Sequence, residues 1–352
     1  MKNEICLVTG GAGFIGSALS GELCARFGRV VVVDNLHPQI HKDSSRPDLL
    51  DSRTELVVGD VTNPQTWEHL LESLSPSVII HLAAETGTGQ SLTESARHAH
   101  VNVTGTAVML DALSKSKSLP RRIILTSSRA VYGEGAWKSK EGGALIYPGQ
   151  RTRDQLSRKD WDFPNMNYMP ATAANTNPMP VSIYGATKLT QEHMISAWCN
   201  ALDVEHVFLR LQNVYGPGQS LTNSYTGIVS LFCRIARENK SIPLYEDGAM
   251  MRDFVIIDDV VSAIVKALDS EPAPLPLDVG SGECTTISSV ANIISKIYNS
   301  PSPHICELFR FGDVRHASCD ILPTIDALQW KPGVSVVEGL NILSSWVEDQ
   351  LS

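Results

Sequence analysis

Tyr184 and Lys188 are four residues apart in the stretch YGATK. If this stretch is helical, the two side chains lie on one face of the helix, one turn apart. An ammonium group beside a phenol favours the phenolate and lowers the pKa of the tyrosine from about 10. Tyr184 could then act as a base near neutral pH. A surface tyrosine and a surface lysine on an ordinary helix are the alternative interpretation of this spacing.

A glycine-rich segment near the N-terminus is a second candidate site. Gly10, Gly13 and Gly16 follow the apolar run Ile5–Val8 and lead into residues 17–26, which have helical spacing. Free backbone N–H groups at the start of a helix bind pyrophosphate. The three glycines would allow a sharp turn, a close approach of phosphate and close packing of helix on strand. The pattern predicts a dinucleotide-binding loop, and a glycine-rich turn in another α/β protein is the alternative.

Acidic residues follow the second and third predicted strands. Asp34 ends the apolar run Val30–Val33, about twenty residues after the glycines, where a carboxylate can hold the two hydroxyls of an adenosine ribose. A carboxylate there would repel a 2′-phosphate, which favours NAD over NADP. Asp60 comes just after the strand predicted at Glu55–Val58 and can reach an adenine amino group, cap the next helix, or do both.

Residues 81–86, with the sequence HLAAET, end the fourth predicted strand. Small residues at this edge of a sheet leave room for a cofactor, and we expect Glu85 and Thr86 to point toward a substrate. His81 is better explained as a buried core histidine than as a ligand. Asn102, at the head of the next long helix, is either a polar cap or a residue that fixes the backbone near the site.

Three arginines in the second half of the chain are candidates to clamp a diphosphate. Arg252, Arg310 and Arg315 stand out because the 352-residue chain is acidic, with a formal charge of −9. Guanidinium groups bind phosphate oxygens in a bidentate fashion. Surface salt bridges are the alternative for each of them.

Composition limits the class of protein. A hydrophobic content of 43% over 352 residues supports one large or two medium domains. The acidic charge argues against nucleic acid or an anionic membrane as the main partner. Seven scattered cysteines without a C-x-x-C pair predict reduced thiols and no metal site. We see no signal peptide and no apolar run near the roughly 20 residues that span a bilayer, so we expect a cytoplasmic protein.

The elements that must position these residues alternate between strands and helices. Helical segments such as residues 65–74 and 101–115 lie between the strands, and this order predicts a parallel sheet covered by helices on both faces. Residues 134–181 form a long proline-containing insertion with a charged piece at 151–162. Loops of this length are usually functional, and we expect a lid that covers the cleft. The first five predicted strands are Ile5–Val8, Val30–Val33, Glu55–Val58, Ser77–His81 and Arg122–Thr126.

Taken together, these motifs resemble the extended short-chain dehydrogenase/reductase family, and within it the NAD-dependent sugar-nucleotide epimerases and dehydratases. The resemblance covers nearly the whole chain. It includes TGGAGFIG, GDV, HLAA, a serine before VYG, YGATK, RDFV and RFGD, in this order. It implies a Rossmann-type doubly wound parallel sheet of the α/β class, with a smaller α/β substrate-binding C-terminal domain. The NAD-binding domain would take residues 1–213 and 254–281, including the insertion, and the nucleotide-sugar domain residues 214–253 and 282–352.

The resemblance also implies roles for single residues. Tyr184 would be the base, Lys188 would tune it and bind the nicotinamide ribose, and Ser128 would hydrogen-bond the sugar hydroxyl. NAD would be held by Gly10, Gly13, Phe14, Ile15, Gly16, Asp34, Asn35, Asp60, Val61, Leu82, Ala83, Ala84, Asn102, Tyr184 and Lys188. The substrate would be held by Glu85, Thr86, Ser128, Arg129, Asn213, Arg252, Arg310 and Asp313.

The residues before VYG help to select the reaction. The family's 4,6-dehydratases carry Thr-Asp-Glu there, whereas this chain has Ser128, Arg129 and Ala130, which cannot supply that acid–base pair. Reductases of the family usually use NADPH, which Asp34 disfavours. The resemblance therefore implies a 4-epimerase: Tyr184 takes the C4 hydroxyl proton as hydride passes to NAD⁺, the 4-keto sugar turns over, and hydride returns to its opposite face.

Three stretches resemble one branch of the family, the dTDP-L-rhamnose 4-epimerases, which interconvert dTDP-L-rhamnose and dTDP-6-deoxy-L-talose for polysaccharides. They are residues 81–90, 127–135 and 211–227. A UDP-hexose or UDP-N-acetylhexosamine 4-epimerase is the main alternative. A reductase and a non-catalytic NAD-binding regulator are further alternatives, although regulators typically lose the tyrosine or the lysine. The family also implies a homodimer through a four-helix bundle, built by the helices that begin near Asn102 and Tyr184.

Overall fold

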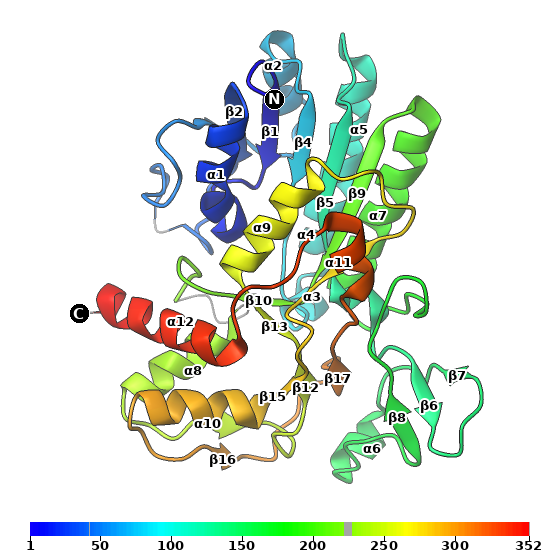
Figure 1. The fold of residues 1–352 in the computed structure, drawn as a ribbon, viewed down its shortest axis with the longest axis vertical. Helices are drawn as coiled ribbons and strands as arrows, with labels where there is room; N and C mark the ends of the chain where they lie inside the picture. The colour runs from blue at the N-terminus through cyan, green and yellow to red at the C-terminus, as the bar shows by residue number, and fades with distance from the viewer. Residues whose placement is uncertain (42, 222–226, 352) are drawn as a thin grey trace.

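The computed structural model describes residues 1–41, 43–221 and 227–351. In these residues the largest sheet has seven strands in the order β14-β9-β5-β4-β1-β2-β3 (Figure 1). Every neighbouring pair in it is parallel, so the predicted parallel α/β fold is confirmed. The strands are β1 (Ile5–Thr9), β2 (Arg29–Asp34), β3 (Glu55–Val58), β4 (Val78–His81), β5 (Arg122–Ser128), β9 (Glu205–Leu211) and β14 (Leu277–Val279).

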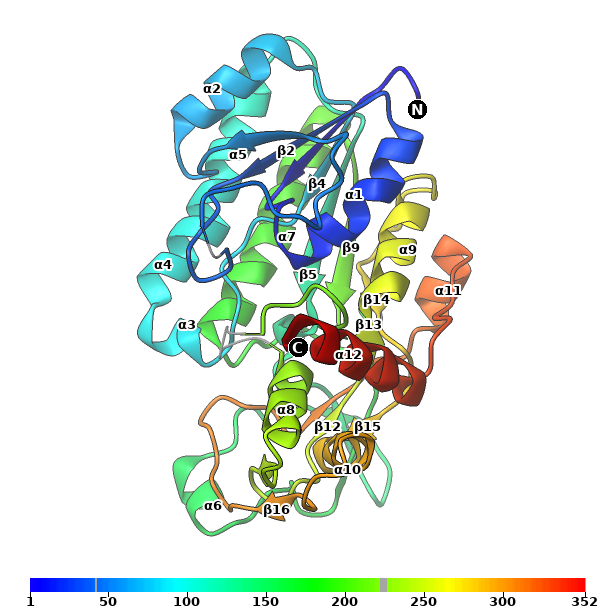
Figure 2. The ribbon, with the colours of Figure 1, turned by 90° about the vertical axis from the view of Figure 1, so that its left-hand side faces the viewer.

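Alternate residues along each strand feed two separate cores, because successive side chains of a strand point to opposite faces. On β2, Val30 and Val32 pack with α1 (Phe14–Arg26) and α9 (Ile257–Ala267). Val31 and Val33 pack on the other face. That face is covered by α2 (Pro64–Ser73), α5 (Gly105–Lys115) and α7 (Ile183–Leu202), as Figure 2 shows.

The helix predicted from residue 101 begins earlier. It starts as α4 (Ser95–Ala99), widens into a π-helical turn, η1 (His100–Thr104), and continues as α5. A short helix, α3 (Gln90–Thr93), precedes it. A π-helical turn places one extra residue in the helix, often at functional sites. Here it contains Asn102, which lies beside α7.

Other parts of the second half of the chain build a smaller region below the sheet (Figures 1 and 2). The final helix, α12, packs on α8 and α10 and has no counterpart in the sequence prediction. The two-domain division at residues 213, 254 and 281 stays a prediction. The helices of this region are α8 (Ile228–Arg237), α10 (Ile287–Ile297) and α12 (Val336–Leu351), whereas α11 (Leu322–Leu328) packs on β14 and α9. The strand groups are β10 (Asn213–Tyr215) with β13 (Phe254–Ile256), β11 (Pro243–Leu244) with β16 (His304–Ile305), and β15 (Thr285–Thr286) with β12 (Met251–Arg252) and β17 (His316–Ala317).

The insertion has a fold of its own. Its antiparallel sheet has the order β7-β6-β8, with β6 (Trp137–Ser139), β7 (Leu145–Ile146) and β8 (Met166–Tyr168), and its charged piece contains the short helix α6 (Arg153–Ser157). The buried Trp137 ring packs against Tyr168 and His316, with centroids 5.6 and 5.2 Å away. The two ends of the insertion lie in contact: the backbone of Gly133 (φ +61°) is so close to the carbonyl of Met179 that a side chain at Gly133 would collide with it. No helix in the described residues is long and apolar enough to cross a membrane.

Candidate active site

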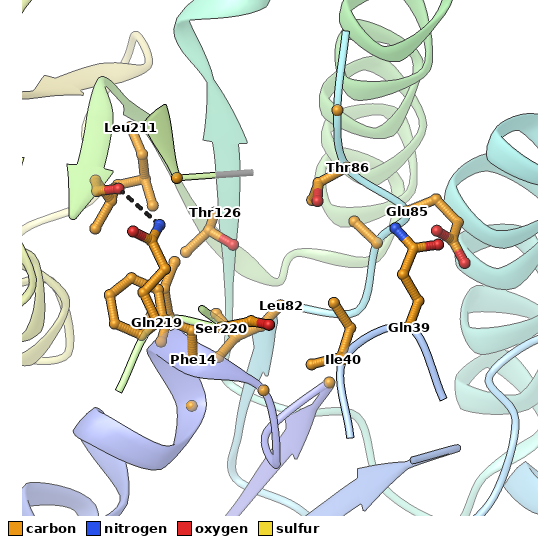
Figure 3. Close-up of a pocket in the computed structure, with 18 of the residues that line it drawn as sticks. Phe14, Gln39, Ile40, Leu82, Glu85, Thr86, Thr126, Leu211, Gln219 and Ser220 are labelled. Carbon is orange, nitrogen blue, oxygen red and sulfur yellow. Dashed lines mark hydrogen bonds between the residues drawn. The ribbon is translucent and has the colours of Figure 1, made fainter. Parts of the chain in front are cut away.

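A cleft of about 1440 Å³ lies at the carboxyl ends of β1, β2, β4 and β5 (Figure 3). The chain order in the sheet reverses between β1 and β4, and ligands of doubly wound sheets bind at such a switch point. The predicted glycine loop, acids, Ser128, Tyr184 and Lys188 all line this one cleft. On the substrate side it is lined by Glu85, Thr86, Arg129, Asn213, Arg252, Arg310 and Asp313.

The glycine loop has the shape that a pyrophosphate requires. Gly10 has φ +64°, and a Cβ there would lie 2.7 Å from the backbone of Ala83. A side chain at Gly16 would collide with the backbone of Gly11, whereas a Cβ at Gly13 would meet only the carbonyl of Gly10, at 3.3 Å. In the described chain α1 has no side-chain cap. Its first N–H groups therefore remain available to phosphate oxygens, and the loop fits NAD.

Asp34 and Asp60 lie where an adenosine would bind. The Asp34 carboxylate accepts from the backbone N–H groups of Ala12 (3.1 Å) and Leu36 (2.9 Å), and so joins the glycine loop to the segment after β2. Asp60 accepts from the N–H and hydroxyl of Thr62, both at 2.8 Å. Burial acts to raise the pKa of Asp60, but the hydrogen bonds from Thr62 and Asn35 outweigh it and lower that pKa. Helix α2 is capped by Asn63 rather than by Asp60.

Many residues of the segments 37–41 and 43–49 line the cleft, although the sequence did not predict them as site residues. The amides of Gln39 and Gln90 bond each other at 2.9 and 3.0 Å. Arg97 donates to Gln39 (2.7 Å) and to Glu85 (2.6 Å), which ties this segment to the end of β4. Figure 3 shows Gln39 beside Glu85. The length of the chain between β2 and β3 was the one available signal, since long loops in compact domains are often functional.

Ser128 and Tyr184 are brought together by packing at the start of α7. Ser182 caps this helix by accepting from the N–H of Gly185 at 3.0 Å. A side chain at Gly185 would collide with the carbonyl of Ala130, so only glycine lets α7 approach the turn that follows Ser128. Tyr184 and Ser128 are hydrogen-bonded. The contact places a hydroxyl beside a phenol on the wall of the cleft.

The pKa values of Tyr184 and Lys188 differ from the sequence prediction. Burial raises the pKa of Tyr184, and the hydrogen bond from Ser128 opposes that shift. Burial also lowers the pKa of Lys188 to about 7, against the influence of Glu192. The Lys188 ammonium donates to Gln191 at 2.6 Å. The expected lowering of the tyrosine pKa is therefore not found in the chain by itself, because desolvation outweighs the hydrogen bond from Ser128.

Asn102 lies behind the wall of the cleft, not on it. It is fully buried, accepts from the N–H of Glu85 (2.7 Å), and donates to the Glu85 carbonyl (3.0 Å) and to Thr187 (2.9 Å). The expected contact with the cofactor is replaced by the alternative role, fixing the backbone near the site. Asn102 connects the end of β4 to the helix that carries Tyr184.

Of the three arginines, only Arg252 and Arg310 line the cleft. The Arg310 guanidinium lies 5.0 Å above the ring of Tyr245. Arg315 is buried in ion pairs with Asp162 (2.8 Å) and Asp247 (2.7 Å), so its prediction as a diphosphate clamp is wrong. Its long side chain reaches carboxylates that the sequence could not place.

Arg129 and Arg252 make the substrate end of the cleft positive. Arg129 donates to the carbonyl of Gly133 at 2.8 Å, and burial together with the charge of Arg252 lowers its pKa to about 10. Within residues 1–41, 43–221 and 227–351, neither guanidinium has a carboxylate oxygen within 4.0 Å. Two such cations at one end of a cleft suit an anionic ligand.

The insertion does not cover the cleft in this structure, and its role as a lid stays a prediction. Of residues 134–181, Val181 alone lines it among the described residues. Arg151 instead anchors the insertion to the smaller region, by ion pairs to Glu134 (3.2 Å) and Glu246 (2.8 Å) and a hydrogen bond to the Asp313 carbonyl (3.0 Å). The insertion therefore supports the substrate-side wall from behind.

Comparisons with known proteins agree with this site. The model of the NAD dependent epimerase/dehydratase family matches residues 6–151 and 163–280. A dTDP-L-rhamnose 4-epimerase of Burkholderia thailandensis is 57% identical over 98% of this chain and 95% of its own. A UDP-glucose 4-epimerase of Mycolicibacterium smegmatis is 28% identical over 95% of both chains.

Solved structures show the same architecture. The UDP-glucose 4-epimerase of Thermotoga maritima with UDP-glucose has a TM-score of 0.82 at 26% identity, over 99% of this chain and 100% of its own. The UDP-glucose 4-epimerase of Thermus thermophilus in complex with NAD has a TM-score of 0.79 at 25% identity, over 98% and 99%.

Proposed function

Because this chain belongs to the NAD dependent epimerase/dehydratase family, we propose that it is an NAD-dependent nucleotide-sugar 4-epimerase acting on dTDP-L-rhamnose and dTDP-6-deoxy-L-talose. One observation carries the proposal. Ser128, Tyr184 and Lys188 share a cleft with a dinucleotide loop, in a chain 57% identical to a dTDP-L-rhamnose 4-epimerase. The residues around Ser128 are consistent with it, since Arg129 and Ala130 leave no acid–base pair for dehydration.

We assign the following catalytic roles to residues of this chain. The chemistry that bound NAD supplies is the reversible removal of the C4 hydrogen of the sugar with its two electrons. Tyr184 removes the C4 hydroxyl proton and later returns it, so no net proton or electron leaves the site. Ser128 donates to Tyr184 or to the sugar oxygen, and its hydrogen bond favours the phenolate. Lys188 holds the nicotinamide ribose and adds positive charge beside the phenol.

Binding would divide along the cleft. Gly10, Gly13 and Gly16 hold the pyrophosphate of NAD, and Asp34 with Asn35 holds the adenosine ribose. The Asp34 carboxylate would repel the 2′-phosphate of NADPH, which argues against a reductase that uses NADPH. Arg252 and Arg310 hold the substrate diphosphate, Asn213 contacts the diphosphate side of the substrate, and Asp313 approaches the nucleoside. Arg129 is a further substrate contact. The remaining cofactor contacts are assigned to Phe14, Ile15, Asp60, Val61, Leu82, Ala83 and Ala84, and the remaining substrate contacts to Glu85 and Thr86.

We also propose a homodimer. Helices α4, α5 and α7 lie side by side on one face of the sheet, where α5 contacts α7 and α4 contacts α7. Two copies of this face would form a four-helix bundle. Sedimentation of the purified protein tests this: a single species of about 38 kDa, the mass of one chain, would exclude the dimer.

The test of the function is a substrate panel. The purified protein is incubated with dTDP-, UDP- and GDP-sugars, and products are followed by NMR. Inversion at C4 of dTDP-L-rhamnose without added cofactor is expected. Inversion of UDP-hexoses alone would instead support the second candidate, a UDP-hexose 4-epimerase, since one relative of 28% identity is a UDP-glucose 4-epimerase. A 4-keto-6-deoxy product, or stoichiometric use of NAD(P)H, would refute both.

A further inference from the structure

The surroundings of Lys188 contain more than the proposed mechanism uses. Its side chain is buried, and its ammonium donates to the amide oxygen of Gln191 at 2.6 Å. In the described part of the chain no carboxylate oxygen lies within 4.0 Å of it. Glu192, the nearest acid along the helix, is turned away and bonded to Arg210 at 2.7 and 3.0 Å. The acceptor for this buried ammonium is therefore neutral.

The orientation of the Gln191 amide follows from its neighbours. A lysine ammonium can only donate, so the amide oxygen must face Lys188. The amide nitrogen then donates to the hydroxyl of Thr106 at 2.8 Å and toward Nε2 of His81 at 3.1 Å. Thr106 in turn donates to the Asn102 carbonyl at 2.6 Å. Gln191 is fully buried, and all its polar atoms have partners.

The path continues to the dinucleotide loop. Burial, followed by the charge of Lys188, lowers the pKa of His81 to about 3, so its ring is neutral. Its Nε2 lies 3.1 Å from the Gln191 amide nitrogen and 3.1 Å from the Thr106 hydroxyl, and its Nδ1 forms a hydrogen bond with the Thr9 hydroxyl at 2.6 Å. The Thr9 hydroxyl also accepts from the N–H of Ala83 at 3.2 Å. Ala83 is the residue whose backbone would meet a side chain at Gly10.

We propose that Gln191 is a positioning residue for the reaction: its amide oxygen holds Lys188 in place without neutralising it, and its amide nitrogen ties that lysine through His81 and Thr9 to the strand ends that carry the dinucleotide loop. The inference rests on the proposed function, since it assigns Lys188 the role of placing positive charge beside Tyr184. A carboxylate in place of Gln191 would pair with the ammonium and cancel much of that charge. An apolar side chain would leave the ammonium without an acceptor.

Loss of the acceptor for Lys188 and loss of its positive charge should shift opposite limbs of the pH–rate profile. In Gln191→Leu the ammonium loses a hydrogen bond, so Lys188 gives up its proton at lower pH and the basic limb moves down. In Gln191→Glu the new carboxylate stabilises the ammonium but shields Tyr184, so the acid limb moves up. The ionisable groups around Lys188 are Tyr184 and Glu192 on α7 and His81 on β4, and all three are unchanged in both variants.

The experiment measures kcat and KM from pH 5.5 to 10 for the wild type, both variants, and a matched control, Gln65→Leu. Gln65 is exposed at the start of α2 and does not line the cleft. Each limb is expected to move by about one pH unit, a tenfold change in the ionisation constant. Gln191→Leu is expected to lower kcat at pH 8 at least about tenfold, with KM for the nucleotide sugar nearly unchanged. Equal losses at every pH would mean a merely structural role and would overturn the proposal.

A second readout does not depend on the substrate. The titration of Lys188 is followed by NMR on protein with ¹³Cε-labelled lysine, with Lys188→Arg used to assign the signal. The midpoint is expected to fall in Gln191→Leu and to rise in Gln191→Glu. Identical midpoints in all folded variants would overturn the proposal. If the wild type turns over no nucleotide sugar while the midpoints shift as expected, the proposed function fails and the contact of Gln191 with Lys188 stands. If Gln191→Leu does not fold, Gln191→Glu decides by itself.

Discussion

Replacing Arg151 by Met tests how the insertion supports the substrate-side wall. Arg151 is 1% exposed and donates to Glu246 at 2.9 and 2.8 Å and to Glu134 at 3.2 Å. It also donates to the carbonyls of Trp161 (3.1 Å) and Asp313 (3.0 Å). Met fills a similar volume but removes every donor. Two buried carboxylates then lose their main partner.

Removing one partner of a buried ion pair costs about 3–5 kcal/mol. Here Arg315 partly compensates, because it pairs with Glu246 at 3.2 Å and its N–H donates to Glu134 at 2.9 Å. We therefore expect the lower end, a loss of about 3 kcal/mol in the free energy of unfolding. The matched control is Arg158→Met in the same insertion. Arg158 pairs with Asp160, and these side chains are 66% and 56% exposed, so its loss should stay under about 0.5 kcal/mol.

The assay is urea unfolding of both variants at pH 8, with linear extrapolation to zero urea. Arg151→Met should also raise KM for the nucleotide sugar several-fold, because Asp313 loses a fixing hydrogen bond, while affinity for NAD stays unchanged. A loss within about 1 kcal/mol of that of Arg158→Met would refute the reasoning. So would a double variant, Arg151→Met with Glu134→Gln, that is less stable than Arg151→Met, since removing an unpaired charge should restore stability.

Three further predictions concern single side chains. Tyr184→Phe should keep its NAD and lose kcat by about 10²–10⁴-fold; measured by NMR turnover and the absorbance of bound cofactor, activity near that of the wild type would remove Tyr184 from the role of base. Asp34→Asn should narrow the preference for NAD over NADP, because repulsion of the 2′-phosphate is relieved. The N–H groups of Ala12 and Leu36 bond different carboxylate oxygens, so the single amide oxygen keeps only one of these bonds. Fluorescence titration with both cofactors measures the preference, and an unchanged affinity ratio contradicts the prediction. Burial raises the pKa of Asp278 from 3.8 to about 7, against the hydrogen bond from Tyr132, so the folded state holds a proton there that the unfolded state releases. The contribution of this protonation to the free energy of unfolding is fully present below pH 4 and is lost as pH rises to 7, by at most about 1.4 kcal/mol per pH unit. Urea unfolding should therefore show a free energy that depends less on pH in Asp278→Asn than in the wild type. Parallel pH profiles of the two proteins would contradict this.

The sheet could be predicted because its strands are short apolar runs that alternate with amphipathic helices. The first five strands differ from their predicted bounds by two residues at most, and the glycine loop lies where its spacing placed it. Patterns of this kind lie within short stretches of sequence, and so do the backbone turn and the phosphate-binding N–H groups that they predict. Family membership and NAD dependence followed from the order of several such motifs.

What failed depends on contacts between distant parts of the chain. The sequence does not distinguish Arg315 from Arg252. Only the folded chain shows that Arg315 forms ion pairs with Asp162 and Asp247. The insertion folds around Trp137, whose partners include His316, far along the chain. Ionisation is equally non-local, since the burial of Tyr184 comes from the whole fold. The roles of the individual site residues stay predictions. Residues 222–226 of the branch-specific stretch 211–227 lie outside the described residues.

The meeting of Gly133 with Met179 has a consequence for how such chains diverge. The insertion leaves and re-enters the body at one point, just after Ser128 and just before Tyr184. Its length and sequence can therefore change while the distance between those two residues stays constant. A segment with joined ends is a replaceable module, and exchanging it between relatives would alter the wall behind Arg252 and Asp313 without moving the serine and tyrosine. Substrate choice and catalysis can then evolve separately in one continuous chain.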